Sequence, residues 1–122
     1  MPKRKNYITV EIMTNTELKI ILAEGESHNV EFKANFDKSI AEEAVAFANA
    51  SGGRIFVGID DAGKAAGTDV SNAAKSRYQD LLRQIMPELV CSVDVFENIL
   101  IICVPEGTEK PYGCSRGFYL RV

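Results

Sequence analysis

The chain has 122 residues, of which 46% are hydrophobic and 25% are charged. This length allows one globular domain with its own core and excludes two such domains. The formal net charge of −3 excludes a wholly basic nucleic-acid-binding surface, although a local basic patch stays compatible with it.

The N-terminal third of the chain predicts a strand, a helix and a second strand. Tyr7–Ile12 alternates apolar and polar residues, and its terminal position predicts an edge strand or a swapped arm. Thr14–Glu17 is a capping box, which opens a helix with an apolar stripe that ends at Gly25. Val30–Ala34 alternates again and predicts a strand.

The middle of the chain predicts a helix followed by a buried strand. Ser39–Glu42 is a second capping box, and its helix continues to about Asn49 before Gly52-Gly53 end it. Arg54–Ile59 is apolar and short, as in a strand, and Asp60–Gly63 has the residues of a tight turn. The alternation predicts that the inner face of this strand consists of Ile55, Val57 and Ile59.

The C-terminal half predicts one more helix and a hairpin. The helix runs from Ser71 or Asn72 to Ile85, and Val90–Phe96 with Ile99–Val104 form the hairpin. Glu106–Ser115 is a polar loop and Phe118–Val122 a final strand. The sequence therefore predicts an α+β (mixed α/β) fold, with one mixed sheet of five to six strands against two to three helices. We expect residues 1–122 to form one domain of sandwich type.

Three motifs follow one another between Glu26 and Lys64. They read E-S-x-x-x-E-F-K, A-F-A-N-x-x-G-G-R and V-G-I-D-D-x-G-K. In this order they closely resemble the Schlafen AlbA-like domain (AlbA_2), which is also described as a DNA-binding domain of prokaryotic transcriptional regulators and as a divergent AAA-like region. The resemblance implies a nucleic-acid-binding domain of such a regulator. Because family members usually continue into further domains, it also implies an N-terminal module excised from a longer protein.

The resemblance implies a second function through three acids. In the animal Schlafen branch, the positions matching Glu26, Glu31 and Asp61 form a carboxylate centre that cleaves transfer and ribosomal RNA with a divalent metal. Clustered carboxylates suit Mg²⁺ or Mn²⁺, and such a metal activates a water molecule. A straight strand would place Glu26 and Glu31 on opposite faces, so they converge only if Gly25–His28 turns or bulges. The alternative is that Glu31 pairs with a lysine and that Asp61 only forms a turn.

Several basic residues are candidates for contact with nucleic-acid phosphates. Lys33 shares a face with Glu31, so it either contacts phosphate or neutralises that acid. Arg54, directly after the two glycines, has the same two interpretations. The remaining candidates are the N-terminal basic tip and one lysine ahead of the second helix, namely Lys3, Arg4, Lys5 and Lys38. Contacts of this kind bind without sequence preference and weaken with salt.

Three further polar features have structural interpretations. The pair Gly52-Gly53 follows a helix C-terminus, whereas phosphate loops use helix N-termini, so we do not assign it to phosphate. For Asn49 the sequence favours a helix cap or a bond to a neighbouring loop over a substrate contact. For Tyr112 and Tyr119 it favours packing or loop anchoring over base stacking.

The cysteines and apolar runs indicate the compartment. The hairpin predicted above turns at Glu97-Asn98, which places Cys91 opposite Val104 and directs Cys103 to the other face. We therefore expect no disulfide between them, and a reducing cytoplasm fits best. No secretory signal pattern is present and no apolar run is long enough to span a membrane.

A third interpretation is a scaffold that forms a homodimer. The predicted terminal strands, Tyr7–Ile12 and Phe118–Val122, could pair between two copies of the chain, because a strand at a sheet edge has unpaired backbone groups. Such a dimer is compatible with nucleic-acid binding, since two copies would double the basic contacts.

Overall fold

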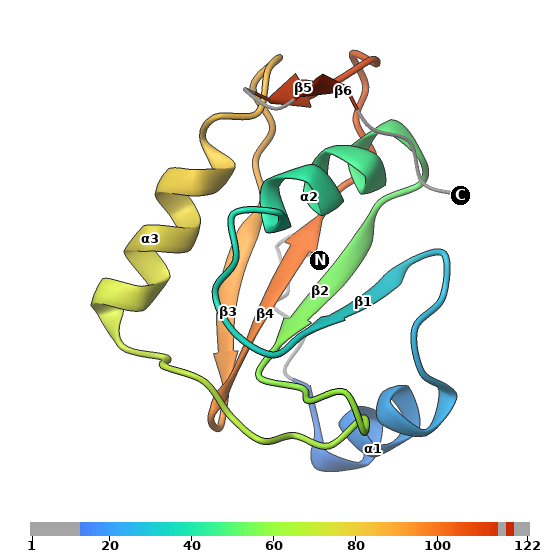
Figure 1. Cartoon of the computed structure of the whole chain (residues 1–122). Coiled ribbons are helices and arrows are strands. Elements are labelled where there is room, and N and C mark those ends of the chain that lie inside the picture. The colour runs from blue at the N-terminus through green and yellow to red at the C-terminus, as the bar shows by residue number, and fades with distance from the viewer. Residues whose placement is uncertain (1–12, 115–116, 119–122) are drawn as a thin grey trace, which may run out of the picture.

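The structure, a computed structural model, describes residues 13–114 and 117–118 (Figure 1). Its elements in chain order are α1 (Asn15–Glu24), β1 (Val30–Lys33), α2 (Ile40–Asn49), β2 (Gly53–Val57), α3 (Asn72–Leu82), β3 (Ser92–Phe96), β4 (Ile99–Val104), β5 (Gly113–Cys114) and β6 (Gly117–Phe118). The predicted α+β single domain is confirmed. Within the described residues the main sheet has four strands rather than five or six, and β5 and β6 form a separate pair.

The main sheet is mixed, with strand order β1-β2-β4-β3. β1 and β2 are parallel, and α2 provides the crossover that a parallel pair requires. β4 is antiparallel to both β2 and β3. The predicted hairpin is confirmed with its register, because Ser92 pairs with Cys103 and Phe96 with Ile99. Its first strand begins at Ser92 rather than Val90, so Cys91 lies just outside the ladder.

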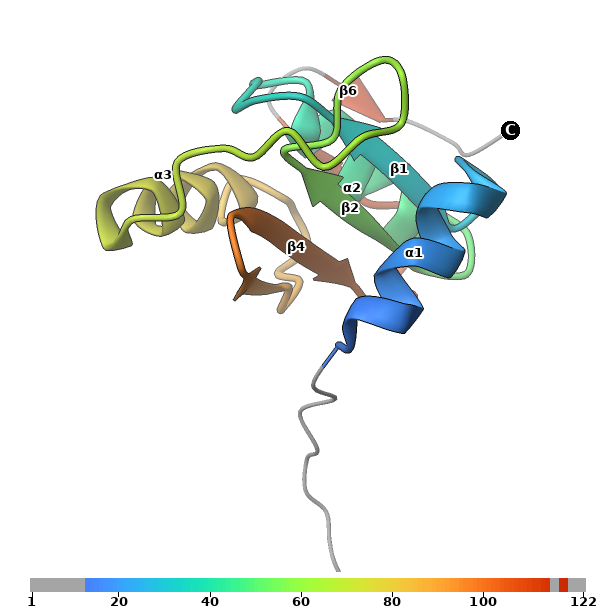
Figure 2. The ribbon, with the colours of Figure 1, turned by 90° about the horizontal axis from the view of Figure 1, so that it is seen from below.

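Helices cover both faces of the sheet. α2 and α3 pack on one face, where the buried cluster includes Phe47, Ile55 and Tyr78. α1 lies on the opposite face (Figure 2), where Leu18 joins a second buried cluster that includes Phe56. Because both faces are covered, β2 is buried without the alternation of a half-exposed strand.

The segment after β2 corrects one prediction about its inner face. Ile55 and Val57 face α2 and α3 as predicted, but Ile59 joins the cluster under α1. Gly58, with φ of 108°, interrupts the strand alternation between them. A Cβ at Gly58 would lie 3.1 Å from the backbone of Gly67 and from the Ile99 side chain, so only glycine fits this bend comfortably.

The two predicted capping boxes have different outcomes. At α1 the box is confirmed, because Glu17 N donates to Thr14 Oγ1 at 3.1 Å and Thr14 N donates to Glu17 Oε1 at 2.9 Å. At α2 the prediction is wrong, since Ser39 is helical in φ and ψ and its side chain caps nothing. Asp37 takes that place, because its Oδ1 accepts from Ser39 N and its carbonyl accepts from Ile40 N, both at 2.9 Å.

Several predicted boundaries shift or cannot be compared. α3 ends at Leu82 rather than Ile85, and β1 ends at Lys33 rather than Ala34. The predicted strand Tyr7–Ile12, and Phe118–Val122 beyond its first residue, lie outside the described residues. Among the helices that the structure describes, none combines the length and apolar character needed to cross a bilayer.

Candidate nucleic-acid interface

The end of β1 meets the beginning of α2. Lys33 Nζ lies 3.2 Å from Ser39 Oγ and 3.5 Å from a carboxylate oxygen of Glu43. The Lys33 carbonyl accepts hydrogen bonds from Gly58 N at 2.7 Å and Ile59 N at 3.1 Å. The predicted cation therefore lies at a junction of three segments, with its charge paired to an acid of α2.

Two residues that the sequence did not single out lie near this junction. The Arg77 guanidinium of α3 stacks 5.3 Å from the centroid of the Phe36 ring, and Phe36 meets the buried Tyr78 edge-on at 5.0 Å. Lys38 is exposed two residues after Phe36. We call Phe36, Lys38 and Arg77 the Phe36 corner. No local pattern connects α3 to this loop, so sequence reasoning had no signal for it.

Arg54 lies on the other face of the sheet from Lys33. It stacks 5.4 Å from the ring centroid of Phe56, whose side chain packs under α1. Lys33 instead contacts α2. The two predicted phosphate contacts are therefore not brought together in one patch. The basic tip Lys3, Arg4 and Lys5 lies outside the described residues.

The segment that carries Glu26 turns back against β1. Ser27 and Val30 exchange backbone hydrogen bonds of 3.0 and 3.4 Å, which reverses the chain. The carboxylate of Glu26 accepts a hydrogen bond from Phe32 N at 3.0 Å. β1 is an edge strand, so Glu26 covers a backbone donor on its open side.

Asp61 lies in an exposed turn after β2. The neighbouring Asp60 organises this turn, because its Oδ1 accepts from Ala62 N and Lys64 N, both at 2.9 Å. Gly63 N donates to the Asp60 carbonyl at 2.9 Å. The predicted turn is confirmed, and Asp61 is its outward-facing member.

The three acids do not fit a metal in this arrangement. Over residues 13–114 and 117–118, no three His, Cys, Asp or Glu side chains are grouped closely enough to hold a metal ion. The chain does turn back at Glu26, but the Glu26 carboxylate is bonded to the backbone of β1. Glu31 lies on the sheet face that α2 covers, and Asp61 lies in a separate turn. We therefore assign no Mg²⁺- or Mn²⁺-dependent step to Glu26, Glu31 and Asp61.

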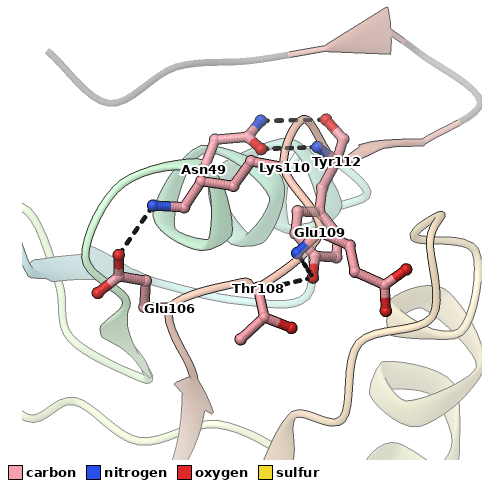
Figure 3. A network of polar contacts seen from close by, with 6 residues as sticks. All are labelled: Asn49, Glu106, Thr108, Glu109, Lys110 and Tyr112. Carbon is pink, nitrogen blue, oxygen red and sulfur yellow. Dashed lines mark hydrogen bonds and ion pairs between the residues drawn. The ribbon is translucent and has the colours of Figure 1, made fainter.

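Asn49 fastens the end of α2 to the loop before β5 (Figure 3). Its Nδ2 donates to the Tyr112 carbonyl at 3.0 Å, and its Oδ1 accepts from Tyr112 N at 2.6 Å. The Tyr112 hydroxyl accepts from Thr108 N and Glu109 N, both at 3.0 Å, and its ring is buried. The structural interpretations of Asn49 and Tyr112 are confirmed, so neither ring face nor amide is available to a base.

All three cysteines are half-buried. Cys91, Cys103 and Cys114 are free. Burial raises the pKa of the Cys91 thiol to about 11, so this thiol stays protonated at neutral pH and is a poor nucleophile.

Comparisons with known proteins give a family and a fold. The family model described as Schlafen, AlbA_2 matches residues 26–122. The search of curated protein sequences finds no significant match. Among solved structures, the DIP2311 protein from Corynebacterium diphtheriae superposes with a TM-score of 0.59 at 20% identity over 88% of this chain. This chain spans only 24% of that protein.

A second solved structure is similar over nearly its whole length. It is the N-terminal domain of a protein from Nitrosomonas europaea named as ATP-dependent DNA helicase RecG-related. The TM-score is 0.51 at 21% identity, covering 86% of this chain and 85% of that domain. At these identities the two structures establish the shared fold alone.

Proposed function

The chain belongs to the Schlafen AlbA_2 family, and from this membership we propose that it is a nucleic-acid-binding domain that contacts DNA in a prokaryotic transcriptional regulator. The observation that carries the proposal is the family match over residues 26–122. The name of the Nitrosomonas europaea neighbour, which refers to a DNA helicase, supports a task on nucleic acid.

The contacts that we propose are made to phosphates. Lys33, Arg54 and Lys38 would each approach the sugar–phosphate backbone, and the basic tip Lys3, Arg4 and Lys5 would add further contacts. Since the first two lie on opposite faces of the sheet, they would serve separate contacts. Binding through phosphates releases counterions, so the affinity should fall steeply with salt and vary little with sequence.

One experiment tests the function and its enzymatic alternative together. The purified chain is incubated with labelled duplex DNA or transfer RNA, in Mn²⁺ or EDTA, and resolved on native and denaturing gels. We expect a salt-sensitive shift on the native gel with the nucleic acid intact on the denaturing gel. Absence of a shift at low salt with both probes would refute the proposed function.

The alternative is a metal-dependent endoribonuclease that uses Glu26, Glu31 and Asp61. Its support is that this chain carries an acid at each matching motif position, although the geometry described above does not group them. Cleavage that requires Mn²⁺ and disappears in Glu31→Ala would establish this alternative. The Glu31→Gln variant is the control for shape, because it removes the charge and keeps the side-chain volume.

Two further expectations remain proposals. We infer a cytoplasmic location, supported by three free thiols, which a reducing compartment maintains. We also propose that the chain forms a homodimer through its terminal strands.

A further inference from the structure

The Phe36 corner is a cationic surface feature, because Lys38 and Arg77 are both exposed. Phe36 is half-buried between two residues of α3, with the Arg77 guanidinium over its face and the buried Tyr78 against its edge. In Figure 1 the segment that links β1 to α2 passes on the α3 side of the molecule. The ring therefore restricts where the Arg77 side chain can lie. A restricted side chain loses less conformational freedom when it binds a ligand.

The acids around the corner are already engaged. Asp37 Oδ1 accepts from Ser39 N at 2.9 Å, and Glu43 pairs with Lys33 at 3.5 Å. Lys38, by contrast, makes no ion pair within the described residues. Its charge is therefore exposed and unmatched by these acids.

Asp69 offsets part of the charge of Arg77. Hydrogen bonds from Ser71 lower the pKa of the Asp69 carboxyl, and the nearby Arg77 lowers it further. Asp69 is therefore ionised at neutral pH and attracts Arg77, yet no ion pair within 4.0 Å joins them in the described residues. Arg77 is exposed and makes no ion pair within the described residues, so its guanidinium keeps N–H donors that a phosphate can use.

We propose that Lys38 and Arg77 bind the phosphate backbone of DNA, with the Phe36 ring holding the guanidinium in position. This inference rests on the proposed function and names a part of its interface that lies on α3 and the β1–α2 segment. Contact of this kind positions the duplex and reads no base.

The test compares two double variants that remove equal charge from equal residue types. In the first, Lys38→Gln is combined with Arg77→Gln. In the control, Lys110→Gln is combined with Arg83→Gln. These two residues are ion-paired elsewhere, Lys110 to Glu106 at 2.8 Å and Arg83 to Asp80. Binding of a labelled duplex is measured by fluorescence anisotropy at several salt concentrations.

We expect the Phe36-corner variant to bind more weakly and with a smaller salt dependence. Each lost phosphate contact lowers the slope of log affinity against log salt by about 0.9, so the double variant should lose about 1.8. The control should keep the slope of the unmodified chain. If the unmodified chain binds and the corner variant keeps its slope, the inference is overturned while the proposed function stands. If the control loses as much, the inference is likewise overturned, because net charge alone would explain binding.

Two single variants distinguish a direct phosphate contact by Arg77 from a purely structural role of this residue. Arg77→Lys keeps the charge and should retain most of the salt slope that Arg77→Gln loses. Asp69→Asn removes the competing charge and keeps the oxygen that accepts from Ser71, so it should raise the affinity severalfold. An unchanged or lower affinity in Asp69→Asn, with an unchanged melting temperature, would contradict phosphate contact by Arg77. Failure of the unmodified chain to bind would refute both the function and this inference.

Discussion

Gly52 stands where the end of α2 passes the end of β4. Its φ is 84°, and its N–H donates to the Phe47 carbonyl at 2.8 Å. A Cβ at this position would lie 2.8 Å from Val104 O and 2.9 Å from Glu106 N, which are both backbone atoms. Glycine is therefore required for two reasons, namely the positive φ and the lack of room for a Cβ atom.

We predict that Gly52→Ala is strongly destabilising. The left-handed conformation costs about 1–2 kcal/mol for a non-glycine residue, and overpacking adds about 1–3 kcal/mol. The free energy of unfolding, measured by urea denaturation, should therefore fall by roughly 2–5 kcal/mol. Gly63→Ala is the matched control, because Gly63 has a similar φ of 79° with nothing within 4 Å of its Cβ position. Equal losses in the two variants would contradict the steric part of this account.

Residues differ in how far the sequence alone reveals their roles. The bond from Asn49 to the Tyr112 loop is one of two structural roles that the sequence left open, the other being a helix cap. Its partner could not be named, since the two residues are distant in sequence. The contact between Arg77 and Phe36 could not be predicted either, because these two residues are also far apart in the sequence. Side-chain contacts between elements depend on how those elements pack, and no local pattern specifies that.

The two sequence patterns read as capping boxes show why local signals succeed or fail. Thr14 has an extended backbone, so its hydroxyl reaches Glu17 N. Ser39 is helical, because Asp37 has already turned the chain, and its hydroxyl accepts from Lys33 instead. An acid two residues earlier thus changed the outcome of the second pattern. Most helices and strands were predictable because their hydrophobic periodicity is a local property of the sequence. The residues at which they begin and end were less predictable, because contacts with neighbouring residues determine them.

We predict that Thr14→Ala and Ser39→Ala differ in their effect on stability. Loss of the Thr14 cap should cost about 1 kcal/mol, since one of the first N–H groups of α1 loses its acceptor. Ser39→Ala removes no cap and should cost less, about 0.5 kcal/mol for a part-exposed bond to Lys33. Urea denaturation of both variants measures the difference. A larger loss in Ser39→Ala would show that α2 depends on this serine as its cap.

The open edge of β1 is protected by the segment before it. Val30 N and its carbonyl are bonded to Ser27, and Phe32 N is bonded to the Glu26 carboxylate. This arrangement gives Glu26 a role in the sheet that is independent of any metal.

We predict that Glu26→Ala lowers the free energy of unfolding by about 1 kcal/mol, because Phe32 N then has only water as acceptor. Glu26→Gln should be close to neutral, since the amide oxygen can still accept the bond. Chemical denaturation of the two variants, in EDTA and in Mn²⁺, provides the comparison. Stabilisation of the unmodified chain by Mn²⁺ that is lost in Glu26→Gln would contradict the edge role and favour a metal site.

At the scale of the whole molecule, the fold class was predictable, whereas the number of main-sheet strands within the described residues was not. Alternation of helix and strand patterns, followed by a hairpin, indicates a mixed sheet with helices on it. A terminal segment can join the sheet only where an edge strand has unpaired backbone groups, and the sequence does not show which strand is at the edge. Convergence of the three acids was not predictable for a related reason, because motif spacing does not determine which faces of the fold the acids occupy, and the structure does not group them.

The free edge of the described sheet is β3, since the Glu26 segment covers β1. An edge strand has unpaired backbone groups that a further strand can bond, and Val95 on β3 is an exposed position at which that pairing can be tested. If Tyr7–Ile12 of a second copy pairs there, light scattering should give the mass of a dimer, and a chain that begins at Met13 should be a monomer. Val95→Lys should weaken the dimer, whereas Ile20→Lys on α1, at a residue 51% exposed, should not.

A monomeric full chain would refute the dimer. A dimer that survives removal of residues 1–12 would place its interface elsewhere.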